Sequence, residues 1–406
     1  MARIVMKFGG TSVADPERIK NVAQRVQREI KRGNEAAVVV SAMAGATNQL
    51  VAWTRALAAI PNAREYDVVV ASGEQVTIGL LAIALDEIGV KAKSWMGWQI
   101  PVKTDGQHAV ARIEAIEGKA LIADMKKKIV PVVAGFQGVA PGGSITTLGR
   151  GGSDTSAVAL AAALKADRCD IYTDVDGVYT CDPRIVTKAR KLDKITYEEM
   201  LEMASLGAKV LQTRSVEIAM AHRVRIQVLS SFTDQPGTLV VDEDEIVEKA
   251  IVSGIAYSRD EAKITLQGIA DRPGVAATIF GALAEEGINV DMIVQSASLD
   301  GKSTDMTFTV GRSDLERAKK TLAAVKRKIS WKKAIFDPSV VKLSVIGVGM
   351  RSHAGVARRM FQTLADNGIN IQAISTSEIK VSVLVDEKFT ELALRALHAA
   401  YGLDAA

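Results

Sequence analysis

The sequence is poor in the residues that nucleic-acid binding, disulfide frameworks and metal sites require. Aromatic residues make up 4% of the 406, and the formal net charge is only +4. The chain therefore lacks both the stacking side chains and the strongly basic character that nucleic acid favours. Two cysteines are too few for a disulfide framework, and four scattered histidines form no metal set. We expect Cys169 and Cys181 to be buried free thiols, and we expect no metal-ligating cluster.

Long apolar runs are also lacking. No run approaches the roughly 20 residues that cross a bilayer, and the N-terminal segment has no signal-peptide core. These absences predict a cytoplasmic protein with no membrane and no nucleic acid among its partners. The hydrophobic content of 48% and charged content of 24% are ordinary for a globular protein. The length is sufficient for two or three domains.

Apolar segments alternate with helical patterns over the first 230 residues. This alternation predicts an α/β sandwich with a mostly parallel central sheet, and such sheets bind ligands at the carboxyl ends of their strands. A helix is expected to begin at Asp15-Pro16, and another pattern is mostly helical over residues 68–87. Strands are expected at residues 4–8, 36–40, 91–95, 129–134, 169–173 and, as the last strand of this half, 224–229.

The C-terminal part contains an internal duplication. A Pro-Gly turn and an acidic run around residues 230–248 indicate a domain boundary. Beyond it, residues 271–290 match residues 352–371 without gaps, with nine identities in twenty positions. The flanking patterns predict two α+β units of βαββαβ order. The expected domains are residues 1–240, 241–338 and 339–406.

The first expected strand ends in a lysine followed by two glycines and two hydroxyl residues. Lys7, Gly9 and Gly10 would supply a mobile cation and backbone N–H donors, which suit a phosphate. The pattern is neither a Walker A loop nor a Rossmann fingerprint. Taken alone, it is also compatible with a tight turn and a solvated lysine.

A second glycine-rich turn, residues 147–157 (TLGRGGSDTSA), precedes an apolar helix. A helix N-terminus favours an anion, and Arg150 adds a planar fork that can hold a carboxylate or a phosphate. We expect Ser153 and Asp154 to cap the helix. A flexible turn before an ordinary helix stays open as the alternative for this stretch taken alone.

Five motifs together resemble the signatures of the aspartokinases, which belong to the amino-acid kinase superfamily. The C-terminal duplication likewise resembles the paired ACT domains of those enzymes. One departure is Gln212-Thr213, where many members have His-Pro; we expect it to affect local packing or nucleotide contacts. The motifs are KFGGTSV (7–13), SGE (72–74), GRGGSDT (149–155), TDVDGVYTCD (173–182) and YEEMLEMASLGAKVL (197–211).

The resemblance implies transfer of the γ-phosphoryl group of ATP to the β-carboxylate of L-aspartate, with Mg²⁺, as the first step toward lysine, threonine and methionine. Catalytic roles fall on Lys7 and Asp154. Glu74 would hold the α-ammonium of aspartate and Arg150 its α-carboxylate. The remaining aspartate residues would be Thr47, Gly151, Gly152 and Ser153. The ATP site would comprise Lys7, Gly9, Gly10, Ser41, Thr173, Asp174, Tyr179, Arg184 and Lys209.

Elementary chemistry agrees with this division of roles. A β-carboxylate with a pKa near 3.9 is already ionised at pH 7, so the nucleophile needs no general base. The obstacle is repulsion between two anions, which cations and N–H donors must offset. We therefore interpret Asp154 as an organiser that holds Lys7 or a water of Mg²⁺, rather than as a proton acceptor.

The ACT resemblance implies feedback inhibition by lysine, threonine or both, and dimerisation through the ACT units. The dimer would be a homodimer or an α₂β₂ assembly with a small subunit matching the C-terminal region. Two alternatives remain: another kinase of the same fold, for acetylglutamate, glutamate or UMP, and a non-catalytic amino-acid sensor. The implied effector residues are Asp271, Gly274, Ala276, Asn289 and Gln295 in the first copy, and Gly355, Asn370, Ile371 and Glu378 in the second.

Overall fold

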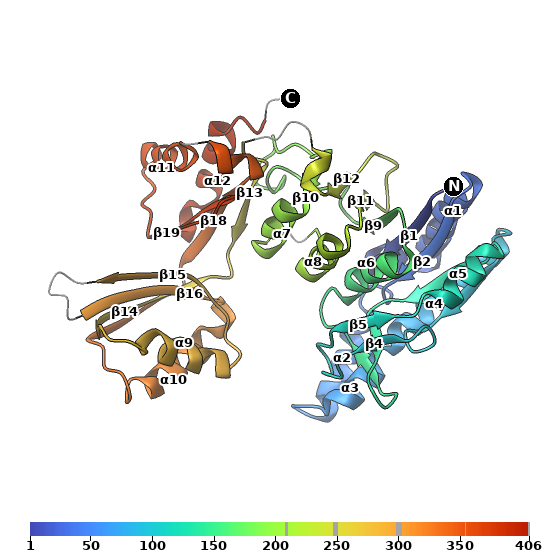
Figure 1. Cartoon of the computed structure of the whole chain (residues 1–406), viewed down its shortest axis with the longest axis horizontal. Helices are drawn as coiled ribbons and strands as arrows, with labels where there is room; N and C mark the ends of the chain where they lie inside the picture. The colour runs from blue at the N-terminus through green and yellow to red at the C-terminus, as the bar shows by residue number, and fades with distance from the viewer. Residues whose placement is uncertain (208–209, 247–250, 298–302, 354, 405–406) are drawn as a thin grey trace. The chain divides into compact units, whose positions relative to one another are not determined.

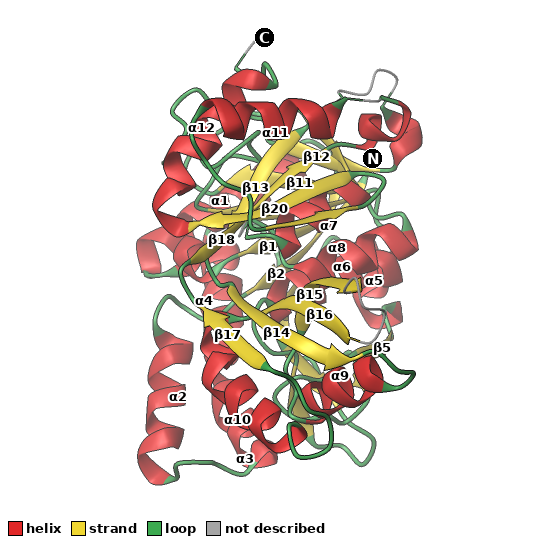
Figure 2. Cartoon of the chain, turned by 90° about the vertical axis from the view of Figure 1, so that its left-hand side faces the viewer, coloured by secondary structure: helices red, strands yellow, loops and turns green. Residues whose placement is uncertain are grey.

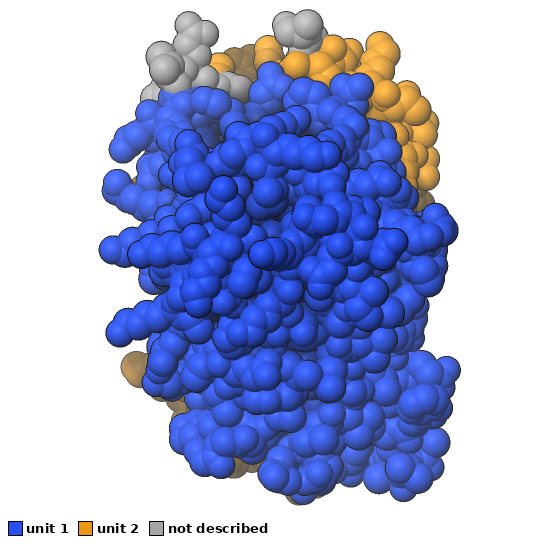
Figure 3. All heavy atoms as spheres, turned by 90° about the vertical axis from the view of Figure 1, so that its right-hand side faces the viewer, with its two compact units in different colours: residues 1–178, 191–204, 209–247 blue, residues 179–190, 205–208, 248–406 orange. Residues whose placement is uncertain are grey.

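A computed structural model describes the chain except for residues 208–209, 247–250, 298–302, 354 and 405–406 (Figure 1). The described residues form two compact units, which Figure 3 shows in different colours. Unit 1 comprises residues 1–178, 191–204 and 209–247. Unit 2 comprises residues 179–190, 205–208 and 248–406.

Unit 1 is built on an eight-stranded sheet in the order β10-β12-β11-β9-β1-β2-β6-β3. All of its pairings are parallel except β11 with β12, so the predicted mostly parallel sheet is confirmed. The strands are β1 (Arg3–Phe8), β2 (Glu35–Val40), β3 (Ala92–Trp95), β6 (Val130–Ala134), β9 (Arg168–Thr173), β10 (Lys194–Thr196), β11 (Ile226–Ser230) and β12 (Thr238–Val241).

The helices of unit 1 cover this sheet, which explains why β1 and β2 are apolar and buried on both faces. The Asp15 carboxylate caps α1 by accepting from the Arg18 N–H, and Pro16 opens the helix as predicted. The helices are α1 (Pro16–Lys31), α2 (Ala46–Leu57), α3 (Ala63–Val70), α4 (Ser72–Glu87), α5 (Lys119–Lys126), α6 (Gly152–Leu164), α7 (Tyr197–Ser205) and α8 (Thr213–His222).

A second, small sheet in unit 1 has the order β5-β4-β7-β8. Its strands are β4 (Val102–Thr104), β5 (Ile113–Ile116), β7 (Gln137–Val139) and β8 (Ile145–Thr147). Strand β8 runs directly into the glycine turn that precedes α6. None of these four strands was expected from the sequence, because each has only three or four residues and no clear alternation.

One expectation for unit 1 needs correction. The strand expected to be the last of this half, β11, is followed by β12, which enters the same sheet antiparallel to it.

The prediction that residues 68–87 are mostly helical is confirmed, because they form the end of α3 and all of α4, which meet at Ala71. Together these helices form a stretch, Ala63–Glu87, that by length and composition alone could cross a membrane. Its side chains Ile78, Leu81 and Leu85 nevertheless lie in the core beside β1 and β2.

Unit 2 contains the two duplicated modules (Figure 2). The first has the predicted βαββαβ order, and its four strands form the sheet β15-β16-β14-β17. Helices α9 and α10 lie on one face of this sheet (Figure 1). The elements are β14 (Ala262–Ala270), α9 (Val275–Glu285), β15 (Val290–Ala297), β16 (Ser303–Val310), α10 (Leu315–Val325) and β17 (Lys333–Asp337).

The second module takes its fourth strand from a distant part of the chain. Its sheet has the order β13-β18-β20-β19, and β13 (Gly254–Ser258) precedes the first module in sequence. The repeat does not reveal this arrangement, because β13 lies outside the matched residues. The other elements are β18 (Val340–Ile346), α11 (Val356–Asp366), β19 (Ala373–Thr376), β20 (Lys380–Asp386) and α12 (Thr390–Ala400). Strand β20 is largely buried because it lies inside this sheet.

Residues 179–190 interrupt the chain of unit 1 and pack within unit 2. Cys181, Ile185 and Val186 join the apolar core formed by β18, β20, α11 and α12. The Thr180 hydroxyl lies 3.0 Å from Nε2 of His398 on α12. Nothing in the sequence pattern predicted this placement. Cys169 and Cys181 are both free and buried, as expected.

Candidate active site

The carboxyl ends of the central strands of unit 1 bring Lys7 and Asp154 together. Lys7 is the penultimate residue of β1 and pairs in register with Val39 of β2 and Ile171 of β9. Asp154 lies in the first turn of α6. The Lys7 ammonium contacts Oδ1 of Asp154 at 2.5 Å, and both side chains are about nine-tenths buried. The contact that the organiser interpretation of Asp154 requires is therefore present.

The turn after β1 approaches the end of β2 too closely for a side chain at Gly10. A Cβ there would lie 2.9 Å from the carbonyl oxygen of Ala42, whereas a Cβ at Gly9 would make an ordinary contact, 3.4 Å, with Lys7 Nζ. The Ser41 N–H donates to the carbonyl of Phe8. The ends of β1 and β2 are thus held together beside the lysine.

Glu74 brings a second carboxylate to the same end of the sheet. It lies in the first turn of α4 and is 2% exposed. Its Oε1 accepts the N–H of Ala42 at 3.0 Å, whereas its Oε2 is buried without a hydrogen-bond partner. Burial raises the pKa of Glu74 to about 7, against the opposing effect of the Ala42 N–H. A buried carboxylate oxygen without a donor is costly unless a cation meets it, which suits the ammonium group of a ligand.

The second glycine turn corrects one expectation. Gly151, with φ +72°, is the N-cap residue of α6, and no side chain caps the helix. Ser153 and Asp154 instead lie inside the first turn, both largely buried. The cap expectation was wrong because a left-handed residue was needed directly before the helix, and glycine adopts that conformation without strain.

Gln212, the residue that departs from the family pattern, packs against this turn. A Cβ at Gly151 would overlap the Gln212 side chain, whose Cγ is 1.9 Å from that position. Gln212 itself precedes α8, and its carbonyl accepts from the Ser215 N–H. The departure therefore bears on the packing of the glycine turn, in line with the expected effect on local packing.

The remaining predicted residues are distributed unevenly. In unit 1, two of them lie at strand ends: Ser41 follows β2, and Thr173 ends β9. Two others lie at helix starts, Thr47 in α2 and Gly152 in α6. The side chains of Arg150 and Asp174 are exposed. Tyr179 and Arg184 lie in unit 2, where Arg184 Nη2 pairs with Asp182 at 2.8 Å. That interaction holds the pKa of Asp182 below its usual range. Lys209 lies outside the described residues.

Sequence reasoning missed Ser231 and Gly135 at this end of the sheet. The Ser231 hydroxyl lies 2.5 Å from that of Ser12, a residue of the predicted turn, and joins this turn to the end of β11. A Cβ at Gly135, directly after β6, would lie 2.8 Å from Cβ of Ser153. Serines and glycines at strand ends were the available signal, but single small residues there are too common to be selective.

No group of three or more His, Cys, Asp or Glu side chains suited to a metal ion occurs among the described residues. Mg²⁺ bound with nucleotide phosphates keeps several waters and needs only one or two protein carboxylates. Asp154 is the carboxylate beside Lys7 and could face such an ion through a water.

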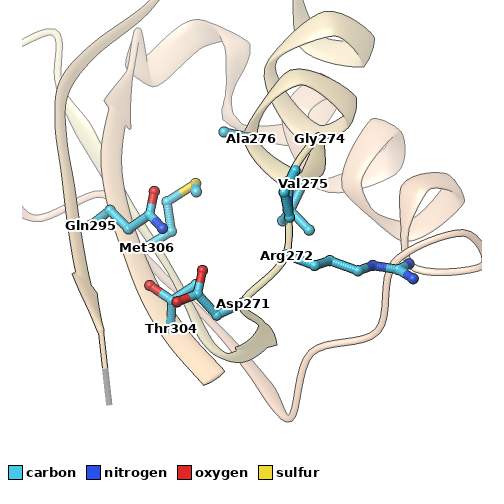
Figure 4. Close-up of a pocket in the computed structure, with 9 residues that line it drawn as sticks. Asp271, Arg272, Gly274, Val275, Ala276, Gln295, Thr304 and Met306 are labelled. Carbon is cyan, nitrogen blue, oxygen red and sulfur yellow. The ribbon is translucent and has the colours of Figure 1, made fainter. Parts of the chain in front are cut away.

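A separate pocket of about 420 Å³ lies in the first module of unit 2. Four of the five residues expected there, Asp271, Gly274, Ala276 and Gln295, line it; Asn289 does not. Figure 4 shows Asp271 beside Thr304, with Gln295 and Met306 on the same side of the N-terminal end of α9. In the second module, Gly355 begins α11 with φ +101°, Asn370 and Glu378 are exposed, and Ile371 is partly buried.

Comparison with known proteins identifies the family to which the chain belongs. The amino acid kinase family model matches residues 2–230, and an ACT domain model matches residues 264–325 and 343–401. The aspartate kinase of Pseudomonas putida is 56% identical over 406 residues, covering 100% of this chain and 98% of that protein. The aspartokinase of Corynebacterium glutamicum is 46% identical, covering 99% and 97%.

Solved structures agree. Escherichia coli aspartokinase III in complex with aspartate and ADP (R-state) is 26% identical, with a TM-score of 0.83 over 98% of this chain and 99% of that one. The same enzyme in complex with lysine and aspartate (T-state) is 27% identical, with a TM-score of 0.78 over 98% of both chains. The chain belongs to the amino acid kinase family with C-terminal ACT domains, and within it to the aspartokinases.

Proposed function

We propose that this chain transfers the γ-phosphoryl group of ATP to the β-carboxylate of L-aspartate. The observation that carries the proposal is the buried Lys7–Asp154 ion pair at the carboxyl end of the parallel sheet, between two glycine turns. The aspartate and ADP complex of E. coli aspartokinase III supports it. The product, 4-phospho-L-aspartate, is an acyl phosphate.

In this mechanism the protein stabilises charge and moves no proton from the nucleophile. The β-carboxylate of aspartate is ionised at neutral pH and attacks directly. Lys7 faces the transferred group, while the N–H groups of Gly9 and Gly10 meet phosphate oxygens. Asp154 positions the Lys7 ammonium. Asp154 could also hold Mg²⁺ through a water, and the ion would supply further positive charge at the nucleotide phosphates.

Aspartate is oriented by charge. The unpartnered Oε2 of Glu74 accepts the α-ammonium, and Arg150 binds the α-carboxylate through its guanidinium fork. Thr47, Ser153 and the N–H groups of Gly151 and Gly152 complete this subsite. Requiring both an ammonium and a second carboxylate selects a free acidic amino acid over an acetylated one or a nucleotide.

The rest of the nucleotide site is assigned on motif similarity alone. Ser41, Thr173 and Asp174 follow strands β2 and β9, which favours contacts with ATP. Tyr179, Arg184 and Lys209 complete the proposed set. These residues are proposals to be tested one at a time, with the KM for ATP as the measurement.

The pocket of unit 2 is proposed to bind the inhibitory amino acid, lysine, threonine or both. The Asp271 carboxylate suits an ammonium group, and the N-terminus of α9 at Gly274 suits a carboxylate. The T-state complex of E. coli aspartokinase III with lysine supports an amino-acid effector. Asn289 and the second-module residues Gly355, Asn370, Ile371 and Glu378 remain part of the proposal.

The decisive experiment is Mg²⁺- and ATP-dependent formation of an acyl phosphate, trapped by hydroxylamine. L-Aspartate is expected to support turnover, and lysine or threonine to reduce it. Acyl-phosphate formation from N-acetylglutamate or glutamate in place of aspartate, or release of ADP with UMP, whose product hydroxylamine does not trap, would assign another kinase of the same fold. Binding of lysine or threonine without turnover of any substrate would indicate a sensor.

A further inference from the structure

A buried carboxylate outside the proposed site holds the segments that flank the Arg150 turn. Asp67, on α3, is fully buried. It accepts hydrogen bonds from the Ala109 N–H at 3.0 Å and from the Thr147 hydroxyl at 2.5 Å, and it lies 2.8 Å from Nδ1 of His108. Burying a carboxylate is unfavourable unless donors surround it. All of these donors come from only two segments, residues 108–109 and the last residue of β8.

A partly buried cation joins the same two segments from another helix. Arg214, on α8, donates to the carbonyl of Leu148 at 2.8 Å and to that of Ala111 at 3.0 Å. Its partial burial lowers the pKa of Arg214. The Ala111 N–H also donates to the carbonyl of Thr147. A fully buried carboxylate and a partly buried guanidinium, on separate helices, thus bridge the loop of residues 107–111 to residues 147–148.

The glycine turn begins directly after these anchored residues. A Cβ at Gly149 would lie 3.2 Å from the Ala109 carbonyl oxygen, so the loop lies against the turn. Ala109 itself has φ +67°, a conformation that costs free energy for a residue with a side chain. The hydrogen bonds to Asp67 hold Ala109 in that conformation.

We infer that Asp67 and Arg214 are positioning residues for aspartate binding. They hold the loop of residues 107–111 and the end of β8 in one arrangement, which sets the conformation of the Gly149–Gly152 turn and so the direction of Arg150. The inference rests on the proposed function, because it assigns these residues to the aspartate subsite. An exposed arginine on a turn of glycines has no rigidity of its own, so the rigidity must come from its flanks.

The chain offers a matched pair of variants for the test. Thr147→Val removes the hydroxyl that donates to Asp67. Thr146→Val removes a neighbouring hydroxyl on the same strand, equally buried, whose partner is Thr104 at 2.8 Å instead. We expect Thr147→Val to raise the KM for aspartate about threefold and Asp67→Asn about tenfold, as for weakened hydrogen bonds to a charged group. Thr146→Val should change the KM for aspartate less than about twofold, and none of these variants should change the KM for ATP by more than that.

A double-mutant cycle separates positioning from general stability. If Thr147 acts through the turn, Thr147→Val should raise the aspartate KM no further in an Arg150→Ala background. An equal rise in both backgrounds, or equal effects of Thr147→Val and Thr146→Val, would overturn the inference. If Asp67→Asn fails to fold, the threonine pair and the cycle still decide the question.

The outcomes also separate this inference from the proposed function. Absence of aspartate-dependent turnover in the unmodified enzyme would refute the function itself. An unchanged aspartate KM in Arg150→Ala would refute the role of Arg150 as the carboxylate-binding group. If the unmodified enzyme turns over aspartate and Arg150→Ala raises the KM for aspartate, but Thr147→Val raises that KM equally in both backgrounds, only the positioning role is refuted.

Discussion

The Lys7–Asp154 pair concentrates the charge on which the proposed chemistry depends. Replacing Lys7 by Ala is expected to lower kcat by about 10²–10³-fold, as for loss of one preorganised donor to a developing anion, with a smaller change in the KM for either substrate. Steady-state kinetics of the acyl-phosphate assay measure both.

Lys103→Ala is the control for that prediction, because Lys103 forms an exposed ion pair with Glu117. It should leave kcat within about twofold, as surface ion pairs contribute little. A Lys7→Ala enzyme with normal kcat and a raised KM would contradict the role of Lys7 at the transferred group.

Glu74 should make aspartate binding depend on pH. Its raised pKa of about 7 means that the carboxylate needed for the α-ammonium is partly protonated near neutrality. The substrate has no group titrating between pH 6 and 8. The KM for aspartate is therefore expected to rise as pH falls from 8 to 6, approaching about tenfold per pH unit well below the pKa. Kinetics across this range test it.

Glu74→Gln should raise the aspartate KM and remove that pH dependence. It should also stabilise the protein at alkaline pH. Because the folded pKa lies above the ordinary value of 4.5, the folded state binds more protons than the unfolded state between these values, and stability falls as pH rises. The gain should therefore be absent below pH 4.5, grow between pH 4.5 and about 7, and be complete above pH 7, as thermal melts would show. An aspartate KM that keeps its pH dependence in the variant would refute the assignment.

At the scale of the element, the glycine turn before α6 requires glycine for two separate reasons. Gly151→Ala places a side chain at φ +72° and where Gln212 lies. The backbone strain should cost about 1–2 kcal/mol of stability. Displacement of the turn should in addition raise the KM for aspartate several-fold.

Gly142→Ala provides the comparison. Gly142 has φ +91°, but a Cβ there meets no atom within 4 Å. The two variants should lose comparable stability in denaturant titrations, whereas only Gly151→Ala should impair aspartate binding. Equal effects on binding would show that the turn acts through global stability alone.

At the scale of the whole molecule, inhibition and catalysis involve different parts of the chain. Asp271→Asn removes the negative charge of the effector pocket and should raise the lysine or threonine concentration for half-inhibition at least about tenfold, since an ammonium would lose its charged partner. Uninhibited turnover should stay within about twofold.

Glu285→Gln, at the far end of α9 and exposed, removes the same charge without touching the pocket and should leave inhibition unchanged. Retained inhibition in Asp271→Asn would place the effector elsewhere. Because allosteric coupling requires an effector to prefer one state, a loss of turnover in both variants would point to damage of unit 2 instead.

The ACT modules are also expected to form the dimer. Edge strands β15 and β19 carry exposed apolar side chains, with Ile293 51%, Val294 39% and Ile374 42% exposed, and such edges favour pairing with another chain. Analytical ultracentrifugation should show a dimer at micromolar concentration. Ile374→Asp should weaken it, whereas Leu392→Asp on α12 should not. A monomeric unmodified enzyme would contradict the prediction, and a second, smaller chain copurifying from the native host would indicate α₂β₂.

Much of this protein follows from local features of its sequence. Apolar segments alternating with helical patterns determine a covered parallel sheet, because strands buried on both faces must be apolar throughout. The glycines of the two turns determine the local backbone, since Gly10 approaches Ala42 too closely for a side chain and Gly149 and Gly151 have positive φ. The repeat of residues 271–290 at residues 352–371 determines two related modules, because similar local sequences form similar helices and turns.

Contacts between distant segments were decided only by the tertiary structure. The transfer of β13 to the second module, the membership of residues 179–190 in unit 2, and the bridges made by Asp67 and Arg214 all join segments far apart in the chain. A single sequence carries no periodic or compositional signal for such pairs. The local pattern around each partner predicts its own helix, strand or turn and contains no information about where the other partner lies. The physical reason is that burial and charge pairing select these contacts after the local elements have formed.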